Sequence, residues 1–206
     1  MRKPGWFAGG AVAGVLLAAA GGLVFLKTRA NGFSARAKPS ALEEYLAEAA
    51  RSAAIPAGAK EKSNPVPNSR EVLAEARAHW ADHCAICHSN DGSGETDMGR
   101  QMYPPAPDMR KEHTQRLTDG ELFYIIENGI RLSGMPAWGD GKEEHSQDSW
   151  KLVHFIHHLP ALSPEEIREM EKLNPKSPDE LEEERQEKEF LNGQTPGKSP
   201  KQHHHH

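Results

Sequence analysis

The residues best suited to chemistry lie in one short run, Cys84-Ala85-Ile86-Cys87-His88, which contains both cysteines of the 206-residue chain. Two residues between the cysteines place both sulfurs along one helical turn, within reach of the two vinyl groups on one side of a porphyrin. The adjacent His88 would then present its imidazole to the iron as an axial ligand. The run therefore predicts covalent attachment of one c-type haem.

Three other interpretations of the cysteine pair are weaker. A thioredoxin-like redox pair requires a βαβ setting, and the sequence contains no convincing strand pattern. A closed zinc site would need two further ligands from scattered histidines, because the chain has no second cysteine pair. An incidental pair would not explain why both cysteines fall in the pattern with a histidine directly after them.

A six-coordinate iron needs a second axial ligand, and Met135 is the best candidate. It lies in the run Gly134-Met135-Pro136-Ala137-Trp138-Gly139, a rigid loop that could hold a thioether in place between two helices. The alternative is that Met135 fills a gap in the core, as methionine often does. Other methionines are expected at the haem periphery, and the nearby histidines are expected to be solvated or to cap helices: Met98, Met102, Met109, His79, His83, His154, His157 and His158.

Three helical patterns must position these residues, and loops rich in Gly and Pro separate them. The first begins near the N-cap Ser69, and the second follows a capping box at Thr118 and ends at Gly129. The third runs from about Asp148 to Pro160. About ninety residues with few large apolar side chains make a thin core, which a covalent haem would complete.

From about residue 69 to residue 160 the chain resembles a bacterial class I cytochrome c. That family has an all-α fold, so the resemblance implies three or more helices around one covalent haem. The N-terminal transmembrane helix expected before them departs from the small soluble members of the family. The resemblance rests on the attachment run, Asn90-Asp91-Gly92-Ser93-Gly94, a Pro-rich loop over residues 103–108, the second helix, the Met135 loop and the Trp150-bearing last helix.

The resemblance implies further contacts. The first and last helices would cross, with Trp80 and Trp150 at or near their contact. A backbone carbonyl from Pro104 or Pro105 would accept the N–H of the proximal imidazole. Apart from the resemblance, Trp138 in the Met135 loop is also expected among the haem-binding residues.

The N-terminus carries an apolar segment. From Trp6 to Leu26 there are twenty-one residues without a formal charge. About twenty suffice to cross a bilayer, so an uncleaved anchor over residues 1–27 is favoured over a signal peptide cleaved near residues 18–20. Because the resemblance implies haem attachment outside the cytoplasm, we expect a single-pass inner-membrane protein with its haem domain on the periplasmic side.

The remaining chain divides into a linker over residues 28–68, a haem domain over 69–162, a charged acidic tail over 163–202 and a histidine tract over 203–206. A capping box at Ser40 predicts a short helix in the linker, which acts as a tether or packs on the domain. The tail is expected to form solvated helices or to be disordered. The histidines are an expression tag or a native metal-binding tract.

Charge and composition narrow the function classes. The chain has a net charge of −5 and only 6% aromatic residues, which argues against a large catalytic barrel. Residues 70–162 hold nine Lys/Arg against fifteen Asp/Glu, a net charge of −6. This acidity argues against nucleic-acid binding and favours a transient interface with a redox partner that has a basic or weakly charged face.

The predicted function is single-electron transfer in a membrane-associated redox chain, by a carrier rather than an enzyme. One alternative is a haem subunit fixed in a larger respiratory complex. Another is a five-coordinate haem that senses a ligand or reacts with peroxide, if Met135 does not bind the iron.

Overall fold

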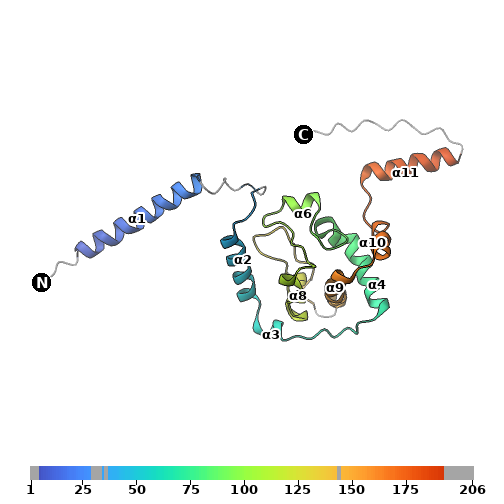
Figure 1. The fold of residues 1–206 in the computed structure, drawn as a ribbon, viewed down its shortest axis with the longest axis horizontal. Coiled ribbons are helices and arrows are strands. Elements are labelled where there is room, and N and C mark those ends of the chain that lie inside the picture. Colours follow the sequence, from blue (N-terminus) through green and yellow to red (C-terminus); the bar gives the residue numbers. More distant parts are fainter. Residues whose placement is uncertain (1–4, 29–33, 35–36, 143–144, 193–206) are drawn as a thin grey trace.

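The computed structural model describes residues 5–28, 34, 37–142 and 145–192, and every regular element within these ranges is helical. Figure 1 shows the arrangement of the elements. In chain order these are α1 (Gly5–Thr28), α2 (Ala41–Ala54), α3 (Ala57–Lys60), α4 (Arg70–His79), the π turn η1 (Trp80–Cys84), α5 (Ala85–His88), α6 (Asp97–Gln101), α7 (Glu112–Gln115), α8 (Asp119–Asn128), α9 (Gln147–His158), the 3₁₀ turn η3 (Leu159–Ala161), α10 (Pro164–Glu171) and α11 (Pro178–Leu191).

Short polar side chains begin the helices that carry the core. The Ser69 hydroxyl accepts a hydrogen bond from Val72 N at 3.2 Å and caps α4. The Thr118 hydroxyl accepts from Glu121 N at 3.2 Å, and the Glu121 carboxylate accepts from Thr118 N at 3.0 Å. Gly129 ends α8 with a φ of 63°, which glycine adopts without a Cβ clash. The predicted starts of these helices and the end of α8 are confirmed.

The core lies where α4 packs on α9 and where α8 packs on α9. Trp80 is 2% exposed, and its ring lies 5.4 Å from the ring of Phe155 on α9. Trp150 stacks instead on Phe123 of α8, with ring centroids 3.8 Å apart and planes within 9°. Of the two tryptophans expected at the contact of the first and last helices, Trp80 lies there and Trp150 joins α9 to α8.

Part of the linker packs on the domain. Thr118 Oγ1 donates to Lys60 O at 2.9 Å, which joins the end of α3 to the start of α8. Gly120 of α8 lies so close to Ala59 O that an added Cβ would come within 3.0 Å of it. Asn64 Nδ2 donates to a main-chain carbonyl of α9 at 2.8 Å. The linker thus packs on the domain from α3 onward. The predicted linker helix itself, α2, buries no residue and touches the domain through Tyr103 Oη, which donates to Glu43 at 3.1 Å.

The packed region extends beyond residue 162, the predicted end of the domain. Met170 of α10 is fully buried in the core. Arg77 of α4 forms ion pairs with Glu166 at 3.1 Å and Glu169 at 2.7 Å, and His158 Nε2 lies 3.1 Å from Glu166. The expectation of a solvated or disordered tail is wrong for α10, because Met170 gives this short helix an apolar anchor. It fits α11, which has no buried residue.

The apolar helix α1 lies apart from the other helices (Figure 1). Its residues Gly9–Lys27 have a mean hydropathy of 2.1, and none of this window is buried. Nineteen residues of this composition are long enough to cross a membrane, a property that signal sequences share.

Candidate functional site

The cysteines and His88 lie on one continuous helical segment that runs from α4 through η1 into α5. Within it the Ala85 N–H donates to Trp80 O, five residues back, which defines a π turn. Such turns occur often at functional sites, and nothing in the sequence pattern predicted this one. Each helical residue turns the chain by about 100°, so one extra residue changes the direction in which Cys84, Cys87 and His88 face relative to the buried side of α4.

Both thiols are free and lack the features of a redox-active pair. Burial raises the pKa of the Cys84 thiol to about 12, with a smaller contribution from Cys87. Burial also raises the pKa of Cys87. Reactive cysteines instead have lowered pKa values, because the thiolate is the nucleophile. The raised pKa values therefore argue against thiol–disulfide exchange at this pair.

His88 is a neutral imidazole with an unsatisfied nitrogen. Burial lowers its pKa to about 4, and the neutral form is the one that binds a metal. The ring lies 5.7 Å from that of Trp80, whose Nε1 donates to Ser89 O at 3.0 Å. Nδ1 of His88 is buried and has no hydrogen-bond partner among the described residues. The expected hydrogen bond from this imidazole to a carbonyl in the region of Pro104 or Pro105 is therefore not made in the structure, and the role of these two residues in haem binding stays a prediction.

Two glycines nevertheless bring the following loops against the attachment segment. Gly94 N donates to His88 O at 2.9 Å, and a Cβ on Gly94 (φ 74°) would come within 3.0 Å of Ala106 O in the Pro-rich loop. Gly99 of α6 lies against Cys87 O at a distance that leaves no room for a Cβ. The Pro-rich loop thus packs where the resemblance implies, through Ala106.

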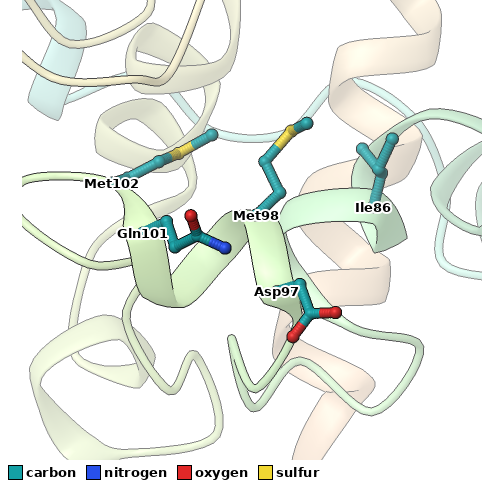
Figure 2. Close-up of a pocket in the computed structure, with 5 residues that line it drawn as sticks. All are labelled: Ile86, Asp97, Met98, Gln101 and Met102. Carbon is teal, nitrogen blue, oxygen red and sulfur yellow. The ribbon is translucent and has the colours of Figure 1, made fainter. Parts of the chain in front are cut away.

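An apolar cleft of about 570 Å³ lies beside α5 and α6. Figure 2 shows Met98 and Met102 projecting into it, with Ile86 on the neighbouring helix between the two cysteines. Asp97 and Gln101 complete the lining. The volume falls within the range of about 300–1,000 Å³ for small-molecule sites. Neither cysteine nor His88 lines the cleft, and Ile86 is the lining residue that belongs to the attachment run.

The loop of Met135 is tied to the end of α8 and reaches the same region. Ile130 N donates to Met135 O at 3.2 Å, and Trp138 N donates to a carbonyl of α8 at 3.1 Å. Gly134 lies so close to the Met102 sulfur that a Cβ would come within 3.0 Å of it. Gly134, the neighbour of the half-buried Met135, therefore lies against Met102, a side chain that lines the cleft.

Trp138 places the other end of this loop against the attachment segment. Its ring is 5.7 Å from the ring of His83, which lies 4.9 Å from the ring of His79. Because His83 directly precedes Cys84, the loop contacts the segment that carries the cysteines. Trp138 is 45% exposed, and its role in haem binding stays a prediction.

The remaining histidines of α9 have polar partners of their own. His154 Nε2 lies 2.7 Å from Val66 O, and His157 Nε2 lies 3.1 Å from an Asp119 carboxylate oxygen. No group of three or more His, Cys, Asp or Glu side chains in the described part of the chain could hold a metal ion. The α9 histidines are therefore neither simply solvated nor helix caps, the two roles expected of them, but join α9 to the linker and to α8.

Sequence reasoning also missed an ion-pair network beside the site. Arg110 donates twice to Asp108, at 2.8 and 2.9 Å, and once to Asp91 at 2.7 Å. Asp91 follows His88 by three residues, and Asp108 ends the Pro-rich loop. The bidentate pair fixes Arg110 on Asp108, and the single bond to Asp91 joins the two loops.

The two thiols, the neutral imidazole, the nearby thioether loop and the apolar cleft form a donor set that fits an iron porphyrin. A comparison with known families agrees. Residues 71–156 match the model of the family described as cytochrome C oxidase, cbb3-type, subunit III. The matched range begins in α4 and ends in α9, so it contains the attachment segment, the cleft and the Met135 loop.

Proposed function

Because residues 71–156 are a c-type cytochrome domain that binds covalent haem c, we propose that this chain transfers single electrons with His88 and Met135 as axial ligands of the iron. The observation that carries the proposal is the Cys84–His88 segment, which holds two free thiols and a buried imidazole on one helical run, with Nδ1 of the imidazole unpartnered among the described residues. When bound, the haem supplies a one-electron Fe(II)/Fe(III) couple, and a His/Met ligand pair raises its potential.

The chain's own residues hold the group and limit what reaches it. Cys84 and Cys87 supply the sulfurs for the covalent bonds. Trp80 fixes the end of α5 through its bond to Ser89 O and so restricts the His88 ring. On the other side the Met135 loop is held by its main-chain bonds to α8. A rigid pair of supports favours electron transfer, because little has to move when the charge changes.

The charge of the domain selects its partner. Its net charge of −6 favours a donor or acceptor with a basic face and a small, short-lived interface. A rate of electron exchange that falls with added salt for a basic partner supports this choice. Faster exchange with an acidic partner contradicts it.

Two observations favour a second candidate, a haem subunit held in a larger respiratory complex. The matching family is an oxidase subunit. In addition, α2 leaves Leu42, Tyr45 and Leu46 between 55% and 68% exposed, an apolar stripe that a neighbouring subunit could cover. Mild detergent extraction followed by sizing distinguishes a monomeric carrier from a subunit.

In either case α1 serves as the membrane anchor, with the haem domain on the periplasmic side, where c-type haem is attached. Protease added to intact spheroplasts should cleave the haem domain. Protection of the domain would contradict this orientation.

The direct test is a pyridine haemochrome assay and a visible spectrum of the full chain matured with haem. We expect one haem per chain and the weak ferric charge-transfer band that reports a thioether–iron bond. Cys84→Ala together with Cys87→Ala should leave no haem after denaturation and extraction. A colourless wild-type protein would refute the proposal.

A further inference from the structure

The end of α10 reaches the helical segment that carries the haem-binding residues. Met170 is fully buried, and the next turn ends with Asn174, whose main-chain N donates to Met170 O at 3.1 Å. Ion pairs from Arg77 to Glu166 and Glu169 fix the other end of the helix on α4. Figure 1 shows α10 beside α4 and α9.

The Asn174 side chain joins two parts of the attachment region. In the amide orientation that satisfies its neighbours, its nitrogen lies 3.1 Å from Ala81 O and 2.9 Å from Asn90 Oδ1, and its oxygen accepts from Asn90 Nδ2 at 3.0 Å. The nitrogen also lies 3.1 Å from Met170 O, which already accepts the main-chain N–H of Asn174. The Asn174 side chain thus contacts Ala81, inside the π turn, and Asn90, two positions after His88.

Ala81 O is the carbonyl that the π turn displaces. In a regular α-helix it would accept the N–H of Ala85, but here that N–H donates to Trp80 O. A buried carbonyl without its helical partner costs free energy unless another donor replaces the bond. The amide of Asn174 is such a donor.

We propose that Asn174 is a positioning residue of the haem site: it stabilises the π turn, and the turn sets the direction of Cys84, Cys87 and His88. Without the extra residue in the turn, these side chains would be rotated by about 100° about the helix axis relative to α4. The two hydrogen bonds between the Asn174 and Asn90 side chains hold the loop after His88 in place relative to the π turn. This inference rests on the proposed haem binding, and it gives α10 a role in the site.

The test compares Asn174→Ala and Asn174→Leu with Asn64→Ala in the full chain. Asn64 is a matched control, because its Nδ2 also donates to a helix carbonyl, Trp150 O, at 2.8 Å, but in α9 away from the attachment segment. Three quantities are measured: the thermal midpoint, hydrogen-exchange protection of the amides of residues 81–88, and the reduction potential of the haem.

We expect both Asn174 variants and the control to lose similar thermal stability. Only the Asn174 variants should lose at least tenfold protection across residues 81–88. They should also change the oxidised-to-reduced ratio at a fixed ambient potential by threefold or more, about 30 mV for one electron at 59 mV per tenfold.

Equal protection and equal potentials in Asn174→Ala and Asn64→Ala would overturn the inference. Loss of the whole fold in both Asn174 variants, with Asn64→Ala folded, would also overturn it, because Asn174 would then be a general stability residue. A wild-type chain without haem would refute the proposed function instead, and the exchange measurement would still test the π turn in that protein.

Discussion

The burial of Met170 makes a sharp prediction about where the folded domain ends. Its side chain is fully buried in the core, although the surrounding sequence is strongly charged. Met170→Ala removes the apolar contacts of this side chain and leaves a cavity between α10 and the core. If α10 is an integral part of the domain, the whole domain must lose stability.

The magnitude follows from the burial. Truncating a fully buried methionine to alanine costs about 2–5 kcal/mol, the sum of lost transfer free energy and the cavity. For a domain of this size each kcal/mol lowers the melting temperature by about 4 °C, so we expect a decrease of about 8–20 °C. The matched control is Phe190→Ala on α11, where the side chain is 72% exposed. Its cost should stay within about 0.5 kcal/mol.

Thermal unfolding of the haem-loaded full chain, followed by circular dichroism at 222 nm and by the haem absorbance, measures both variants under one condition. The two probes should report one transition for each protein. A Met170→Ala protein that melts at the same temperature as Phe190→Ala would refute the argument, since α10 would then contribute nothing to the domain.

Three further predictions follow from the site and its supports. Met135→Ala should abolish the weak ferric band of a thioether–iron bond while Met98→Ala keeps it, and a band that survives in Met135→Ala would exclude Met135 as the ligand. Gly120→Ala should lower the free energy of unfolding by about 1–3 kcal/mol, because its Cβ meets Ala59 O. It should also speed protease cleavage between residues 55 and 66. Unchanged cleavage would show that the packing of α3 does not depend on this contact. Hydrogen bonds from Arg110 hold the pKa of the Asp108 carboxyl below its usual 3.8, so this pair stabilises the fold fully above that pH and loses its effect as the pH falls through the lowered pKa. Arg110→Ala should therefore be less stable than wild type at pH 6 and converge with it in acid, and a difference that persists at about pH 2 would assign the loss to packing.

Local signals predicted the elements, because a cap or a stop acts within four residues of itself. Ser69, Thr118 and Gly129 mark helix ends by hydrogen bonds and dihedral angles that neighbouring residues determine. The attachment run was equally local. Its chemistry depends on spacing along one helix, and no distant residue had to be placed to recognise it.

Features that depend on distant partners were missed. The π turn has no sequence pattern of its own, and its displaced carbonyl is matched by Asn174, more than ninety residues later. Met170 is the one buried side chain of α10, and a single apolar residue does not make the amphipathic pattern that would indicate packing. The resemblance implied a carbonyl partner for His88 from Pro104 or Pro105, but the loop packs through Ala106. Spacing alone does not determine which carbonyl of a loop meets a ring.

The contact of α3 with α8 also limits how far the domain can travel. Because residues from α3 onward are fastened to the folded core, only α2 and the segment between Thr28 and Ala41 separate the end of α1 from that core. The twelve residues numbered 29–40 span at most about 40 Å even when fully extended. With α1 in a bilayer, this segment and the 14-residue α2, about 21 Å long, limit how far the haem domain can move from the membrane, so a membrane-bound partner within that reach meets it at a local concentration near the millimolar range of short tethers. Lengthening this segment should slow exchange with a membrane-bound partner and leave exchange with a diffusing one unchanged.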